Sequence, residues 1–154
     1  MTKTPWLMGM TIGMTLTIVG TLADPVAARD DRIMLPIRDA LDAPDARAKL
    51  DRGVRLHFGG GSPGGAAKDL GVWKSNKKAN AFLRDDKVAC QRAFLSAVLS
   101  LQERARKVGG NAVANIASNY RNVPTSSPSE YMCGAGNLMA GVALTGRVIR
   151  IGGN

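Results

Sequence analysis

The sequence predicts an α+β fold in which a small antiparallel or mixed sheet of about four to five strands packs against one long amphipathic helix, with short helices on the N-terminal side. Three observations lead to this prediction. Apolar residues recur at every third or fourth position through residues 86–108, as on a helix with one buried face. Alternating or β-branched segments flank this helix on both sides. The chain of 154 residues suits one hydrophobic core.

The first 28 residues have the features of a secretory signal peptide. Lys3 gives a positive start, residues 6–23 carry no charge, and Val26-Ala27-Ala28 has small residues where a signal peptidase cuts. We therefore expect export, a periplasmic location, and cleavage between Ala28 and Arg29. The alternative is an uncleaved membrane anchor, because 18 uncharged residues just reach spanning length.

Residues 29–52 are expected to form an N-terminal helical segment. Pro36 and Pro44 each suit the first turn of a helix, and helix-forming residues follow both of them. Residues 53–151 are then expected to form a single α+β domain, because a chain of this size can bury one core and the sequence shows no internal repeat.

The first half of this domain contains two expected strands and a loop. Polar and apolar residues alternate over Gly53–Phe58, which predicts a half-buried strand with His57 on its polar face. A flexible glycine-rich loop, Gly59–Ala67, follows it. Leu70–Trp73 is expected to be a short second strand, and the polar, basic residues 74–80 come after it.

The long helix is the strongest structural signal of the sequence. Asp85 or Asp86 can cap its start, and Gly109-Gly110 ends it. Further strands are expected at 111–118 and, because glycines interrupt it, as two strands within 131–151. The apolar face of the helix consists of Cys90, Ala93, Phe94, Ala97, Val98, Leu101, Ala105 and Val108.

The chain has two cysteines, Cys90 and Cys133. An even number of cysteines in an exported protein favours one internal disulfide, which would attach the long helix to a late strand. Two separate buried thiols or an intermolecular bridge are the alternatives. A redox-active pair is not expected, because the sequence has no CxxC motif.

Residues 101–116 resemble a helix-turn-strand motif in a family of small exported proteins of Gram-negative bacteria, whose members are often named "excinuclease ATPase subunit". The resemblance covers most of residues 32–148, and both cysteines match the family's pattern. It implies no established activity. A more distant likeness, confined to the Gly109–Val113 turn and the strand after it, is to YbjQ-like domains named as heavy-metal-binding and to the outer-membrane stress sensor RcsF. The other matching segments are Met34–Ile37, Ser75–Phe82 and Ser127–Gly146.

The glycine-rich loop lacks the residues of two catalytic motifs. A phosphate loop needs a lysine and a hydroxyl residue after its last glycine, but Gly60–Gly65 is followed by Ala66-Ala67. Ser62 fits the Gly-x-Ser-x-Gly pattern of a nucleophile elbow, yet Pro63 offers no N–H for an oxyanion hole and the only histidine, His57, precedes the serine. We therefore expect no catalytic residue and no cofactor.

A metal site is not expected either. His57 has no His, Cys or carboxylate companions at ligand spacing. A solvated or cross-strand histidine is the favoured interpretation. The distant likeness to metal-binding domains supplies no set of ligands.

The formal charge of +9 is concentrated in one part of the chain. The signal segment contains one lysine and one aspartate, so its removal leaves the charge unchanged. Residues 73–107 contain nine Lys and Arg against three Asp and Glu, with aromatic residues among them. This pattern suits an anionic polymer or a lipid surface, but a charged face that only keeps the protein in solution is also consistent with it. The candidate anion-contact residues are Trp73, Lys74, Lys77, Lys78 and Arg84.

From the sequence we expect an exported, non-enzymatic binding or envelope-maintenance module that contacts anionic lipid, lipopolysaccharide or an envelope protein. Nucleic acid is not expected as a partner outside the cytoplasm. The alternative is a structural or stress-sensing domain that binds another protein or a second copy of itself. A third interpretation, an excinuclease ATPase subunit, rests on the family's name alone.

Overall fold

The computed structural model describes residues 28–61 and 63–152, and it confirms the α+β class. Residues 1–27 of the predicted signal peptide lie outside the described residues. None of the helices in the described ranges is long and apolar enough to cross a membrane. In chain order the elements are β1 (Asp31–Pro36), α1 (Ile37–Asp42), α2 (Pro44–Lys49), β2 (Arg55–Phe58), β3 (Ala67–Asn80), α3 (Asp86–Lys107), β4 (Ala112–Ser118), η1 (Tyr120–Asn122), β5 (Glu130–Ala135) and β6 (Met139–Ile151).

Strand β6 is the centre of a six-stranded mixed sheet. Along one edge it pairs with β3, antiparallel and over nearly its whole length. The other edge is shared, because β5 pairs with the first part of β6 and β4 with the second part. Strand β1 continues the sheet beyond β5 in the antiparallel sense, and β2 runs parallel to β4.

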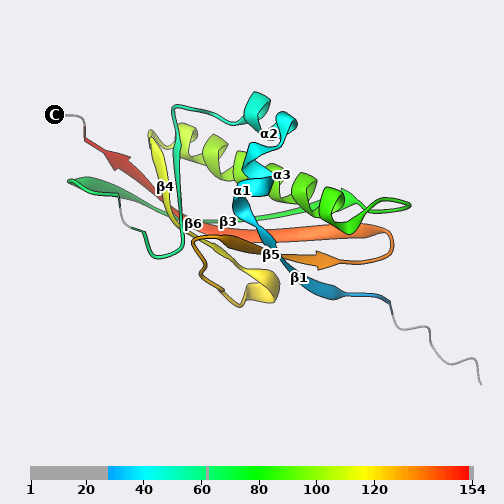
Figure 1. The fold of residues 1–154 in the computed structure, drawn as a ribbon. Coiled ribbons are helices and arrows are strands. Elements are labelled where there is room, and N and C mark those ends of the chain that lie inside the picture. Colours follow the sequence, from blue (N-terminus) through cyan, green and yellow to red (C-terminus); the bar gives the residue numbers. More distant parts are fainter. Residues whose placement is uncertain (1–27, 62, 153–154) are drawn as a thin grey trace, which may run out of the picture.

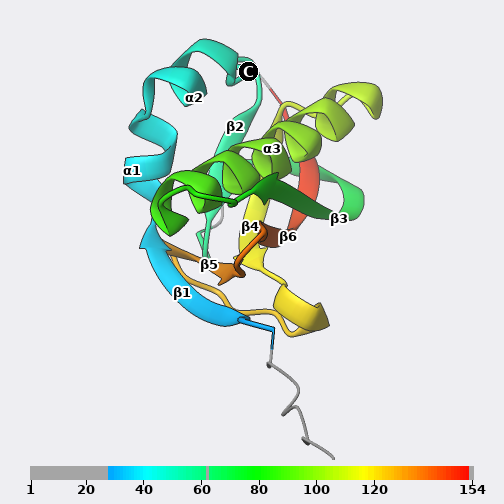
Figure 2. The ribbon, with the colours of Figure 1, turned by 90° about the vertical axis from the view of Figure 1, so that its right-hand side faces the viewer.

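The α-helices lie on one side of the sheet and η1 lies on the other, as Figure 1 shows. We call the side covered by the long helix α3 the inner face and the opposite side the outer face. Figure 2 shows α3 crossing the inner face obliquely, with α1 and α2 beside it.

Helix α3 supplies one half of the hydrophobic core. Asp85 caps it, as expected, by accepting hydrogen bonds from two backbone N–H groups of the first turn. Its predicted apolar face is buried from Cys90 to Ala105, and Val108 is half-buried. The ring of Phe94 stacks on Tyr131 of β5, with ring centroids 4.1 Å apart. The other half of the core consists of inward side chains of β4, β5 and β6.

Two expectations about the secondary structure were wrong. The segment 29–52 is not wholly helical, because Asp31–Pro36 forms β1 and pairs with β5 from the distant part of the chain. The basic residues 74–80 are not a polar connection after a short strand. They continue β3 to Asn80, since each pairs with a residue of β6. Both segments become strands through long-range pairing.

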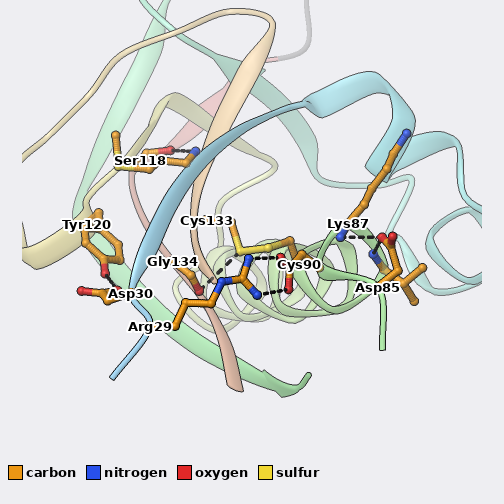
Figure 3. Close-up of a disulfide and its surroundings, with 12 residues drawn as sticks. Arg29, Asp30, Asp85, Lys87, Cys90, Ser118, Tyr120, Cys133 and Gly134 are labelled. Atoms are coloured by element: carbon orange, nitrogen blue, oxygen red, sulfur yellow. Dashed lines mark hydrogen bonds and ion pairs between the residues drawn. A yellow bond between two sulfur atoms is a disulfide. The ribbon is translucent and has the colours of Figure 1, made fainter. Parts of the chain in front are cut away.

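The sulfur atoms of Cys90 and Cys133 lie 1.99 Å apart, which is disulfide distance (Figure 3). Cys90 lies in the second turn of α3 and Cys133 in β5, and both side chains are fully buried. The pair therefore attaches the start of α3 to the sheet, as expected for an internal bridge.

We predict that the denatured, unreduced protein has no thiol that reacts with a labelling reagent, and that reduction exposes two. Replacing both cysteines with Ala should lower the free energy of unfolding by about 2 to 5 kcal/mol, because the bridge restricts the unfolded chain. Mass spectrometry after labelling and urea unfolding measure the two effects. Two labelled thiols before reduction would contradict the bridge.

Gln102 joins α3 to the chain that precedes β2. Its Oε1 accepts from the backbone N–H of Asp51 at 3.0 Å, and its Nε2 donates to the backbone oxygens of Asp51 and Val54, each at 2.9 Å. The side chain is buried. Because buried backbone groups need partners, this one amide fixes the path of residues 51–54.

Gln102→Leu should therefore lower the free energy of unfolding by about 1 to 3 kcal/mol, because the N–H of Asp51 and the oxygen of Val54 lose their partner with little change in volume, while the oxygen of Asp51 keeps the N–H of Val54. Gln91→Leu is the matched control on the same helix, since Gln91 makes no side-chain hydrogen bond with the described residues. Urea unfolding compares the two variants. Equal losses would show that the amide has no special role.

Candidate functional site

The structure divides the five predicted anion-contact residues among three places. Lys74 and Lys78 lie on the outer face of β3, opposite Thr145 and Gly141 of β6. Trp73 and Lys77 belong to the inner face, because side chains alternate along a strand. Arg84 lies in the exposed turn between β3 and α3. The predicted set is therefore not a single surface.

Trp73 has a structural contact on the inner face. The guanidinium carbon of Arg104, on α3, lies 3.5 Å from the centre of its ring. A cation over an indole face at this distance is attractive, and the stack fastens α3 to the edge strand. The ring of Trp73 is therefore occupied by a neighbour within the protein.

Lys74 and Lys78 border a groove on the outer face. It consists of two adjoining hollows of about 360 and 170 Å³, which share Asn76, Arg121 and Ala143. Lys78 lines the larger hollow and Lys74 the smaller one. We call these two hollows together the outer groove.

Small residues form the floor of the outer groove. Gly141 and Ala143 come from β6 and Gly134 from β5, and at Gly141 the space above the backbone is open enough for a ligand to approach the sheet closely. Tyr120 lies on Gly134, and a Cβ added to this glycine would lie only 2.5 Å from the ring (Figure 3). The glycine thus makes room for the tyrosine that closes one side.

The wall opposite the lysines is η1, and its backbone conformation is unusual. Arg121 and Asn122 both have positive φ, 50° and 63°. This region is unfavourable for residues other than glycine, and such strain is found most often at functional sites. Asn122 accepts a hydrogen bond from Nζ of Lys74 at 3.4 Å, so the strained turn contacts β3 across the groove.

Asp30, just before β1, orients the η1 wall. Its carboxylate accepts hydrogen bonds from the hydroxyl of Tyr120 and from the guanidinium of Arg121. The hydrogen bond from Tyr120 lowers the pKa of Asp30, and the same bond raises the pKa of Tyr120. Arg32 lies 5.4 Å from the centre of the Tyr120 ring. The tyrosine is thus fixed by a carboxylate and a neighbouring cation.

The outer groove carries a net positive charge. The cations that line it are Arg29, Lys74, Lys78 and Arg121, and Asp30 is the one acidic lining residue among those described. Arg29 and Arg121 already have carboxylate partners. Neither lysine forms an ion pair with any described residue. Two ammonium groups are therefore available for an anion.

Sequence reasoning missed the residues of the η1 wall. Tyr120 and Arg121 lie in a segment that reads as a loop, and Arg29 and Asp30 come just after the predicted signal peptide. The one local signal is the pair of asparagines around Tyr120-Arg121, since Asn tolerates positive φ better than most residues.

A separate hollow of about 610 Å³ lies between α1 and β2 and is lined by Asp42, His57 and Ser129 among others. His57 is half-buried, and its Nε2 is buried with no hydrogen-bond partner in the described part of the chain. Of the two alternatives expected for this histidine, the solvated one does not hold for Nε2, and the cross-strand one stays a prediction. Ser62, of the elbow pattern, lies outside the described residues.

Within residues 28–61 and 63–152, no three His, Cys, Asp or Glu side chains lie close enough together to hold a metal ion. No family model, curated protein or solved structure matches the chain. The family resemblance found in the sequence stays a prediction.

The chain has two tyrosines, which allows a direct test of the η1 wall. Tyr131→Phe removes the other phenol, whose buried hydroxyl has no partner in the described structure. In this background the pKa of Tyr120 should lie above the ordinary value of about 10, because the hydrogen bond that its hydroxyl donates to the Asp30 carboxylate stabilises the protonated phenol. Asp30→Asn should return the pKa of Tyr120 toward that ordinary value. Phenolate absorbance measures the titration.

Asp31→Asn is the control for this titration, because Asp31 pairs with Arg29 and makes no side-chain hydrogen bond to Tyr120. The same midpoint in the Asp30 and Asp31 variants would refute the arrangement.

Proposed function

We propose that this protein is an exported, non-enzymatic module that binds the phosphate groups of anionic envelope lipids in the outer groove. The observation that carries the proposal is that Lys78 and Lys74 line two adjoining hollows, which share Arg121 and have glycine and alanine in their floor. Ammonium and guanidinium groups are the usual protein ligands of phosphate. The small floor residues suit the close approach of a headgroup.

Two further considerations favour a lipid phosphate over other polyanions. The signal peptide expected from the sequence would place the protein outside the cytoplasm, where lipid phosphates are abundant and chromosomal DNA is absent. The outer groove is also short and closed on one side by Tyr120 and Arg121, which suits a headgroup better than a long polymer. Lipopolysaccharide offers the same phosphate chemistry as a phospholipid.

A structural or sensory protein–protein domain is the second proposal. The observation that favours it is β3, which spans 14 residues and pairs only with β6 among the described strands. An edge of this kind can accept a strand from another chain or a second copy. Crosslinking in the envelope that persists at high salt would support this function in place of lipid binding.

We predict that Lys74→Gln/Lys78→Gln weakens binding to phosphatidylglycerol vesicles by about 30-fold, because each lysine near an anionic surface contributes roughly 1 kcal/mol and the two losses add. Binding should also weaken as salt increases, since salt screens exposed charges. Co-sedimentation with vesicles measures both effects. Phosphatidylcholine vesicles should bind weakly, and competition by lipopolysaccharide distinguishes the two sources of phosphate.

Lys77→Gln/Arg92→Gln is the matched control, because it also removes two exposed cations but leaves the outer groove unchanged. If it weakens binding as much as the groove variant, the net charge of the protein explains the binding and the groove does not. If neither variant changes binding, the proposed function is wrong.

A further inference from the structure

Four large apolar side chains are exposed at one end of the molecule. We infer that this end inserts into the interface of an anionic phospholipid bilayer. Phe82 and Leu83 follow β3 and are 57% and 90% exposed; Leu138 ends the turn between β5 and β6, Met139 begins β6, and they are 63% and 45% exposed. We call these four residues the apolar tip. The inference rests on the proposed function, whose lipid partner it shares.

The two turns that carry the apolar tip are neighbours. The backbone N–H of Ala81 donates to the oxygen of Leu138 at 2.9 Å, and Asn80 pairs with Met139. Figure 1 shows both turns at the same end of the sheet, and Figure 2 views the molecule from that end. The two neighbouring turns thus bring four exposed apolar side chains to one end of the molecule, and exposed apolar residues gathered in one region are a mark of an interaction site.

Hydrogen bonds fix the turn that presents Phe82 and Leu83. Asn80 Oδ1 accepts from the N–H of Phe82 at 2.8 Å, and the N–H of Arg84 donates to the oxygen of Ala81 at 3.1 Å. Leu83 has a φ of 54°, an unfavourable conformation for a leucine. The backbone therefore holds this side chain in solvent instead of turning it toward the core.

The charges around the apolar tip match an anionic surface. Lys78 and Arg84 are exposed and form no ion pair with a described residue. Of the nearby acids, Asp85 caps α3 and Asp86 is paired with Arg29. Apolar residues with a basic border are typical of protein segments that enter the headgroup region.

The outer groove opens beside the apolar tip. Lys78 and Met139 both line its larger hollow. A lipid beneath the tip would therefore have its phosphate within reach of Lys78 while the apolar side chains contact the upper part of the acyl chains. The groove and the tip then face the same bilayer, and the long axis of the sheet points toward it.

The test places a fluorescent reporter in the apolar tip. In Phe82→Trp, emission should shift to the blue on addition of phosphatidylglycerol vesicles, and lipids with brominated acyl chains should quench it. The wild-type chain, which contains Trp6 and Trp73, supplies the background signal. Quenching at position 82 reports insertion of the tip itself, whether or not residues 1–28 have been removed. Absence of both the shift and the quenching would overturn the inference.

A second measurement uses polar substitutions. Phe82→Ser/Leu83→Ser should reduce the vesicle partition coefficient by about tenfold or more. The wild type gains free energy when these two large apolar side chains leave water, and the serines remove this gain. Val72→Ser is the matched control, since Val72 is 51% exposed but lies in the far half of β3. Circular dichroism checks that each variant is folded. Equal partitioning of the tip variant and the wild type would overturn the inference.

The outcomes separate the two proposals. If Lys74→Gln/Lys78→Gln weakens binding while the indole introduced by Phe82→Trp remains in water, the groove binds lipid and the apolar tip does not insert. If that indole is quenched while the lysine variant binds as well as the wild type, the tip inserts and the proposed groove is wrong.

Discussion

No side chain fits at Gly146 of β6, because inward side chains of the neighbouring strand β4 occupy the space above it. A Cβ at this position would lie 2.6 Å from Cγ1 of Val113 and 3.3 Å from Cγ1 of Ile116, and Cδ1 of Leu101 on α3 would be in ordinary contact at 3.6 Å. This packing of β4 and α3 over Gly146 defines the inner face of β6. Because β3 is in register with β6, it also determines that Lys74 and Lys78 point outward. The outer groove thus depends on packing at the opposite face of the sheet.

The parts of the fold that depend on local patterns could be predicted from the sequence. Helix α3 has an uninterrupted apolar face, a capping aspartate and a terminal glycine pair, so its position was correct to within a residue or two. Strand β1 has no such pattern, since Asp31-Arg32 precede its apolar residues and a proline ends it. The second half of β3 was missed because lysines occupy both of its faces, which hides the alternation of a strand.

The candidate site could be predicted only in part. Charge counting led to the strand whose lysines border the outer groove, but the faces of these lysines could not be assigned without knowing that β3 extends to Asn80. The residues of the opposite wall are distant in sequence. Asp30 meets Tyr120 only because β1 pairs with β5, and Gly134 on β5 leaves space for the ring. No local property of Tyr120 or Arg121 indicates this proximity.

The pairing of β1 with β5 also constrains the order in which the chain can fold. Ile33 pairs with Cys133, one hundred positions later. Closing so long a loop is slow and has a high entropic cost, which local contacts cannot offset. Strand β1 can dock only once β5 is available to pair with it. Asp30 and Arg32 arrive with β1, so the η1 wall is incomplete until β1 has docked, although its N-terminal contributors are the first described residues to be synthesised.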